Sequence, residues 1–155
     1  MRIYRIERKK YIESALLGIG ASRSKGFRWN GLNTKLVYTA ESRALAYLEV
    51  SVHMDLSEDL PQNRYCVEIE IPDELLILEV KVDDLPDDWN AMPPTFTTQF
   101  IGDDFVFANE APVLKVPSSI VPLEFNYLIN PNHTDAKKIA VMNHTRMIFD
   151  DRLRP

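Results

Sequence analysis

The sequence predicts a mixed α+β domain, and three observations support this class. The chain has 155 residues, of which 45% are hydrophobic and 26% are charged, as expected for one globular domain. Segments with strand character outnumber segments with helix character. The strands are also not separated by regular helical crossovers, which disfavours a doubly wound parallel sheet. A chain of this length buries roughly two-thirds of its unfolded surface and needs neither disulfides nor metal to fold.

Four elements are expected in the first half of the chain. Residues 1–6 alternate weakly between apolar and polar side chains and predict a strand, and the run LVYTA at 36–40 predicts a stronger one. A helix is expected from Ser42, a suitable N-cap, to about His53. Its apolar side chains recur at helical spacing: Leu45, Leu48 and Val52. Residues 65–71 alternate with a period of two, the clearest strand signal in the chain.

The second half is expected to contain mainly strands. An apolar run at 75–82 predicts one strand, and the Asp- and Pro-rich segment 83–94 (DDLPDDWNAMPP) is interpreted as a connection. A short helix is expected at 95–108, after a pair of prolines. Three further strands are expected: 113–116, 125–129 and 138–149. We therefore predict one domain that spans residues 1–155.

Composition and charge exclude several functional classes. Cys66 is the single cysteine, which excludes an intrachain disulfide and a cysteine-based zinc site. Residues 1–10 lack the apolar core of a signal peptide, and no apolar run approaches the ~18 residues that cross a bilayer, so we expect a cytoplasmic protein without a membrane anchor. The net charge of -5 argues against broad nucleic-acid binding, and the basic cluster at residues 5–10 is interpreted as solvated surface.

The sequence does not match three familiar functional-site motifs. A dinucleotide-binding fingerprint begins at Gly18 and Gly20, but its third glycine would fall at Arg23. The three histidines share no metal-ligand spacing. The G-x-S-x-G elbow of serine hydrolases is absent. We therefore expect no Rossmann-type site, no metal centre and no Ser-His-Asp triad.

Glu49 is the most informative carboxylate. It follows Leu45 by one turn and precedes Val52 by one turn, which places it on or beside the apolar stripe of the predicted helix. Burial of an unpaired carboxylate costs several kcal/mol, so the side chain either reaches the edge of the stripe or meets a cation or a ligand. A structural ion pair is the alternative to a functional role.

Two other candidates lie upstream. Arg28 stands between Phe27 and Trp29 in the segment KGFRWNG, whose glycines let the backbone approach a ligand. Its guanidinium suits a phosphate or a carboxylate, and the alternative is a surface arginine stacked on Trp29. Tyr38 lies in the middle of a predicted strand, where a tyrosine is ordinarily a core residue with one hydrogen-bond partner.

A proline-bracketed serine pair opens the last third of the chain. Ser118 and Ser119 lie in VPSSIVP at 116–122, where the prolines fix the direction of the backbone. From pattern alone, Ser119, Asn126 and His133 belong to a turn that leads into a strand.

Together and in this order, these segments resemble the RES domain, the toxin half of bacterial toxin–antitoxin pairs whose antitoxin carries a Xre-type helix-turn-helix. The similarity covers nearly the whole chain in six ordered segments: 4–6, 26–31, 37–40, 46–50, 116–122 and 125–133. It places the signature arginine, tyrosine, glutamate and serine of the family on these residues: Arg28, Tyr38, Glu49 and Ser118, with Ser119 as the alternative serine. Two departures are Phe27, where the family usually has a glycine, and Phe105, where an aromatic residue is commonly tryptophan.

The resemblance implies an ADP-ribosyltransferase-like fold with small mixed sheets around a cleft for NAD. It implies a toxin that degrades NAD at the nicotinamide–ribose bond, by hydrolysis or phosphorolysis. The alternatives are ADP-ribose transfer to a host protein and, in a different class, a non-enzymatic binding module in which Arg28 and Glu49 form only a structural pair. NAD is then a substrate, and no resident cofactor is expected. The implied partner is a Xre-type antitoxin that covers the cleft, and the resemblance leaves a homodimer open.

The resemblance also implies roles for the signature residues. Glu49 would stabilise positive charge on the ribose, and Arg28 would bind the pyrophosphate. Tyr38 would stack on nicotinamide. Ser118 would bind the ribose side or hold Arg28, and Asn126 would join the NAD-binding residues.

Overall fold

A computed structural model of the chain describes residues 1–57 and 60–154. It contains seven strands: β1 (Arg2–Arg8), β2 (Val37–Ala40), β3 (Arg64–Glu70), β4 (Ile77–Glu79), β5 (Val113–Pro117), β6 (Phe125–Ile129) and β7 (Ala140–Met147). Its α-helices are α1 (Ile19–Ser22), α2 (Arg43–Ser51) and α3 (Phe96–Ala108). Short 3-10 helices complete the list: η1 (Lys9–Tyr11), η2 (Val82–Asp84), η3 (Thr134–Lys138) and η4 (Asp151–Leu153). The predicted α+β class is confirmed, while the predicted domain end at residue 155 lies outside the described residues.

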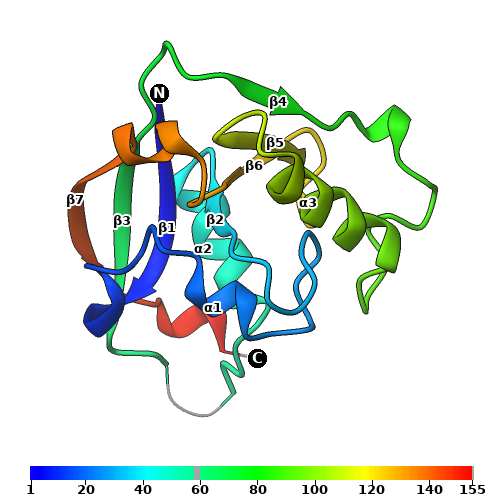
Figure 1. Cartoon of the computed structure of the whole chain (residues 1–155). Coiled ribbons are helices and arrows are strands. Elements are labelled where there is room, and N and C mark those ends of the chain that lie inside the picture. The colour runs from blue at the N-terminus through cyan, green and yellow to red at the C-terminus, as the bar shows by residue number, and fades with distance from the viewer. Residues whose placement is uncertain (58–59, 155) are drawn as a thin grey trace.

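All seven strands belong to one sheet with the order β4-β5-β6-β2-β1-β3-β7. The β4–β5 pair is parallel and the other pairs are antiparallel. The sheet has two parts, β4-β5-β6-β2 and β1-β3-β7, joined by one register pair, Tyr4 opposite Ala40. Arg5 strengthens this seam, because its Nη1 donates a hydrogen bond of 2.9 Å to the Tyr38 carbonyl. In Figure 1, β7 and α3 lie at opposite ends of the molecule.

The predicted elements are present, with shifts of a few residues at their ends. The largest difference is the strand expected at 75–82, which is reduced to Ile77–Glu79 because the chain turns into a 3-10 helix at Val82–Asp84. The helix expected after the proline pair has 13 residues. Ser42 is the N-cap of α2, as predicted, and its hydroxyl accepts a hydrogen bond from the Leu45 amide at 3.0 Å.

The apolar stripe predicted for α2 is wrong in its position. Leu48 and Val52 are exposed, at 38% and 54%, whereas Leu45 and Ala46 are buried. The helix packs on β1 and β2, and the buried contacts of Leu45 and Ala46 are with Ile6 of β1 and Ala40 of β2. The rotation of the helix on this surface leaves Glu49 at the edge of the buried face, one turn from Leu45.

A second apolar cluster lies beneath α3 and supports the loop that carries Arg28. Its buried members include two tryptophans and residues of α3, β5 and β6: Trp29, Leu36, Trp89, Phe105, Ala111, Leu114, Val116 and Leu128. The aromatic residue expected at Phe105 is thus a core residue, 7% exposed. In the described part of the chain, no helix has the length and apolarity that crossing a bilayer requires.

Candidate active site

Glu49 is held at one of its two carboxylate oxygens. Its Oε1 accepts a hydrogen bond of 3.0 Å from the Ser118 hydroxyl and one of 2.7 Å from the Asn126 side-chain amide. Ser118 directly follows β5 and Asn126 lies on β6, so α2 and two neighbouring strands meet at this carboxylate. Within residues 1–57 and 60–154, no hydrogen bond or ion pair reaches the Oε2 atom of Glu49. The carboxylate is therefore oriented through Oε1, while Oε2 keeps its full capacity to accept hydrogen bonds.

Ser118 is fixed as a donor to Glu49. The side chain is buried, and its Oγ accepts hydrogen bonds of 3.1 Å from the amides of Ile120 and Val121. These two amides occupy the acceptor side of the hydroxyl, so its proton points to Glu49. Of the two serines that the sequence left open, Ser118 is the one in contact with Glu49.

Asn126 brings a second polar atom to the same place. Its amide nitrogen is bound to Glu49, but its Oδ1 is buried and has no hydrogen-bond partner among the described residues. A buried acceptor without a partner is unfavourable, and a donor group of a ligand would satisfy it.

Arg28 is tethered by backbone carbonyls. Its Nη1 donates hydrogen bonds of 2.7 Å to the Trp89 oxygen and 3.0 Å to the Ala91 oxygen. Neither Nε nor Nη2 has an acceptor in the part of the chain that the structure describes. Burial lowers the pKa of the guanidinium from its usual value, and the negative charge of Glu49 opposes this effect. Arginine stays a cation under these conditions, so a free guanidinium edge lies within the field of Glu49.

Two alternative interpretations of Arg28 are wrong. A surface arginine stacked on Trp29 is not found, because Trp29 is only 2% exposed and packs against Trp89. An ion pair between Arg28 and Glu49 is also not found among the described residues, where the guanidinium binds carbonyl oxygens instead.

Tyr38 supports residues 23–33, the arginine loop, with its hydroxyl. The hydroxyl donates a hydrogen bond of 2.7 Å to the Asn30 Oδ1 and accepts one of 3.0 Å from the Trp29 amide. Burial raises the pKa of this hydroxyl well above its usual range, so Tyr38 is neutral. Its ring lies 5.0 Å from the ring of Phe27, the residue that departs from the family pattern. The proposed stacking of Tyr38 on nicotinamide stays a prediction.

The sequence-predicted residues form two adjoining groups. Glu49, Ser118 and Asn126 are in direct contact. Arg28 and Tyr38 lie next to each other on the arginine loop and its neighbouring strand, and both Tyr38 and Glu49 influence the pKa of Arg28. In the described part of the chain, no group of three or more His, Cys, Asp or Glu side chains is arranged to hold a metal ion.

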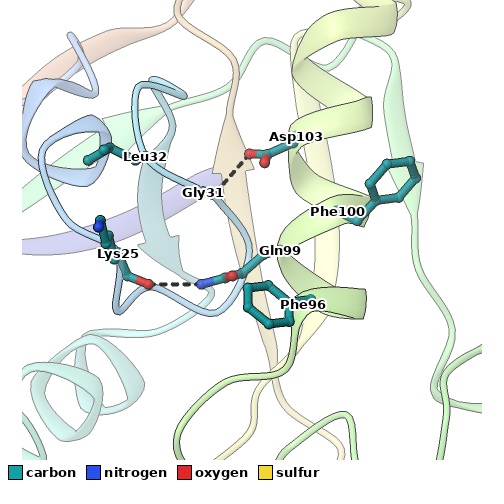
Figure 2. Close-up of a pocket in the computed structure, with 7 residues that line it drawn as sticks. All are labelled: Lys25, Gly31, Leu32, Phe96, Gln99, Phe100 and Asp103. Atoms are coloured by element: carbon teal, nitrogen blue, oxygen red, sulfur yellow. Dashed lines mark hydrogen bonds between the residues drawn. The ribbon is translucent and has the colours of Figure 1, made fainter.

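Sequence reasoning missed the residues that hold Arg28. Trp89 and Ala91 lie in the segment interpreted as a connection, and they act through carbonyl oxygens that every residue possesses. A shallow hollow of about 400 Å³ lies between the arginine loop and α3 (Figure 2). Its lining includes two side chains that bind the loop backbone, Gln99 and Asp103. Their only trace in the sequence is a spacing of four residues on a predicted helix.

Comparisons with known proteins identify a family, relatives of similar sequence and a solved structure with the same fold. Residues 2–150 match the family described as RES domain. The chain is 43% identical over 147 residues to the "Prs ADP-ribosylating toxin" of Sphingobium sp. (strain YBL2), covering 94% of this chain and 90% of the relative. It is 39% identical over 154 residues to the "Toxin Res" of Photorhabdus laumondii, covering 99% and 97%. Among solved structures, a chain of the M. tuberculosis MbcT–MbcA toxin–antitoxin complex has the same fold, with a TM-score of 0.76 at 19% identity over 94% of this chain and 83% of that chain.

Proposed function

The chain belongs to the RES domain family, and from this premise we propose that it is the toxin of a toxin–antitoxin pair and degrades NAD by cleaving the nicotinamide–ribose bond. The family match and the toxin names of the relatives support the biological role. The observation that carries the chemical part is Glu49, a carboxylate with one oxygen bound by Ser118 and Asn126 and the other without a partner in the described chain. Such an arrangement suits a group that faces developing positive charge.

The chemistry needs a fixed negative charge more than it needs a proton relay. As the bond between the ribose C1′ and the nicotinamide nitrogen breaks, its electron pair leaves with nicotinamide, which departs as a neutral molecule. Positive charge then develops on C1′ and the ribose ring oxygen, and the Glu49 carboxylate stabilises it. Water attacks C1′ and releases a proton to give ADP-ribose. In phosphorolysis, phosphate attacks the same carbon and gives ADP-ribose that carries a phosphate at C1′.

The remaining groups bind and orient NAD in this proposal. Arg28 keeps its Nε and Nη2 groups for the pyrophosphate, since Nη1 is already bound to Trp89 and Ala91. Asn126 offers its unpartnered Oδ1 to a donor of the substrate. Tyr38 contributes its ring, because its hydroxyl is already engaged with Asn30 and Trp29.

Nicotinamide release tests this proposal most directly. Purified protein is incubated with NAD, with and without inorganic phosphate, and nicotinamide and the sugar product are followed by chromatography. We expect release under at least one condition, and a requirement for phosphate would identify phosphorolysis. No release under either condition would contradict NAD cleavage.

A second candidate is ADP-ribose transfer to a protein. The name of one relative, "Prs ADP-ribosylating toxin", at 43% identity, favours it. The same cleavage would then be completed by a nucleophile of the acceptor protein in place of water or phosphate. Labelled NAD in a cell lysate separates the two: a discrete labelled protein supports transfer, and rapid turnover without one supports degradation.

The proposed partner is a Xre-type antitoxin that acts on the toxin in the cytoplasm. The structural relative comes from a toxin–antitoxin complex, and the net charge of -5 suits a partner with a basic surface. Co-expression with the product of the neighbouring open reading frame, followed by co-purification, tests the pairing. Recovery of the toxin alone would contradict it.

A further inference from the structure

The loop that carries Arg28 has no regular secondary structure of its own. Residues 23–33 follow the short helix α1 and include bends and turns, but no strand or helix. The placement of a guanidinium on such a loop depends on what binds the loop backbone. Two side chains of α3 do so, one binding the loop before Arg28 and one after it along the chain. Figure 2 shows both, Gln99 bound to Lys25 and Asp103 bound to Gly31.

Gln99 binds the loop before Arg28. Its side-chain amide nitrogen donates hydrogen bonds of 2.9 Å to the Lys25 carbonyl and 2.9 Å to the Phe27 carbonyl. A side-chain amide nitrogen has two hydrogens, so both donors of this group are bound to the loop. The second bond reaches the peptide unit that precedes Arg28.

Asp103 binds the loop after Arg28. Its Oδ1 accepts a hydrogen bond of 2.9 Å from the Gly31 amide. A Cβ at Gly31 would lie 2.8 Å from the other carboxylate oxygen of Asp103, so a side chain at this position would displace the carboxylate that binds the loop. The sequence suggested that this glycine lets the backbone approach a ligand, but in the structure it lets the backbone approach α3.

The helix and the loop also touch backbone to backbone. Gly102 is buried, and a Cβ at this position would lie 1.6 Å from the Trp29 carbonyl oxygen. Gln99 and Asp103 are four residues apart, so they project from the same side of α3 toward the loop. The loop is thus fixed at residues 25, 27, 29 and 31, which surround Arg28.

The segment just before α3 binds the guanidinium of Arg28. This guanidinium is bound by carbonyls of residues 89 and 91, which precede α3 along the chain. We propose that Gln99 and Asp103 are positioning residues for Arg28, setting the direction in which its free guanidinium edge meets the pyrophosphate of NAD. This inference rests on the proposed function, in which Arg28 binds that group.

Two variants remove the bonds without disturbing the buried backbone contact. Gln99→Met keeps the length of the side chain but has no donor, and Asp103→Leu removes the acceptor. Asp103→Asn is the rescue variant, since it keeps an acceptor oxygen, and Thr97→Ala changes an exposed residue of the same helix as a control. Gly102→Ala is unsuitable because the added Cβ would prevent α3 from packing on the loop.

We expect Gln99→Met and Asp103→Leu each to raise the KM for NAD about fivefold to tenfold, with a kcat change of less than about threefold. Their Kd for ADP-ribose, which needs no turnover, should rise in parallel. Asp103→Asn and Thr97→Ala should resemble the wild type in both measurements. If folded Gln99→Met and Asp103→Leu proteins keep wild-type KM and Kd, the positioning role is wrong.

A third readout separates this inference from the proposed function. Hydrogen exchange of peptides that contain residues 25–31, and the rate at which phenylglyoxal modifies Arg28, should both increase in Gln99→Met. Unchanged exchange and modification would overturn the positioning role whatever the substrate is. A wild-type protein that neither binds nor cleaves NAD would instead overturn the proposed function, while these two rates would still decide whether α3 positions Arg28.

Discussion

Glu49 contributes a negative charge that its neighbours orient without neutralising. Ser118 and Asn126 both donate to its Oε1, and Glu49→Gln keeps the shape and an acceptor oxygen while removing the charge. We expect kcat for nicotinamide release to fall about 10²–10³-fold, because one electrostatic contact to the transition state is lost. NAD affinity and thermal stability should change little, as calorimetry would show.

The exposed Glu110 provides a matched control for this charge removal. Glu110→Gln should leave turnover unchanged. Full activity of Glu49→Gln would show that another residue carries the charge, even with the family assignment intact.

Arg28 should behave differently from Glu49 because a phosphate contact acts in the ground state and in the transition state. Arg28→Ala should weaken NAD binding and reduce kcat/KM by about tenfold to 10²-fold, since hydrogen bonds to charged groups contribute about 1.5–3 kcal/mol. Arg28→Lys should recover only part of this loss because it lacks the planar fork. Titration calorimetry and initial rates measure both effects, and an unchanged Kd in Arg28→Ala would place the pyrophosphate elsewhere.

At this scale the sequence could single out candidate side chains, but it could not show which of them are in contact. The order of motifs singled out Arg28, Tyr38, Glu49 and Ser118 without any structural information. Glu49 is 69 residues from Ser118 and 77 residues from Asn126, so their meeting depends on the tertiary fold. The contacts that hold Arg28 could not be predicted for another reason. They are made by backbone carbonyls, which every residue type possesses.

At the scale of the element, α3 is apolar on both sides and only one side is covered. Phe105 is 7% exposed beneath the helix, whereas Phe96, Phe100 and Phe107 are 90%, 70% and 90% exposed. The proline pair before the helix let the sequence predict where it starts. Because the phenylalanines are of the same residue type, the sequence does not indicate which of them the sheet would cover. Contact with β5 and β6 decides that, because Phe105 packs with Leu114, Val116 and Leu128.

Two phenylalanines two positions apart therefore give a matched pair for stability. Phe105→Ala should lower the free energy of unfolding by about 3–5 kcal/mol, because it removes a buried ring and leaves a cavity. Phe107→Ala should change it by less than about 0.5 kcal/mol, because the ring is already in water. Urea denaturation measures both values. Equal losses in the two variants would mean that α3 packs through a different face.

At the scale of the whole molecule, the number of strands was predictable and their order was not. Hydrophobic patterning locates strands, but it does not say which strands pair. β1 lies between β2 and β3 and meets β2 through one residue pair, while β1 and β3 align from Arg2 opposite Glu70 to Arg8 opposite Arg64. Strand order is set by how the apolar clusters beneath α2 and α3 pack against the sheet, which depends on all elements together.

The hydroxyl of Tyr38 links the stability of the whole chain to alkaline pH. Burial raises the pKa of Tyr38 above the usual value of 10.0, so the folded chain keeps this proton after the unfolded chain has lost it. Its contribution is fully present below pH 10 and is lost as the pH rises further. We expect the free energy of unfolding to fall above that pH by up to about 1.4 kcal/mol per pH unit from this group.

Tyr38→Phe tests this linkage by urea denaturation between pH 8 and about 11. The variant should be less stable at pH 8, since two hydrogen bonds are lost, but its stability should decline less steeply above pH 10. Parallel declines in the two proteins would show that Tyr38 is not the group responsible.

The distance along the chain between Glu49 and its partners has a consequence for synthesis. The Asn126 that binds Glu49 is added to the growing chain 77 residues later, about 4 to 15 s at a translation rate of roughly 5–20 residues per second. Three other parts of the site are also synthesised late: Ser118, the strand β6 that lies beside β2, and the helix α3 that binds the arginine loop. A ribosome-bound chain that stops before residue 113 therefore contains Arg28 and Glu49 but lacks Ser118 and Asn126, so the contacts that orient the Glu49 carboxylate cannot form until most of the chain has been made.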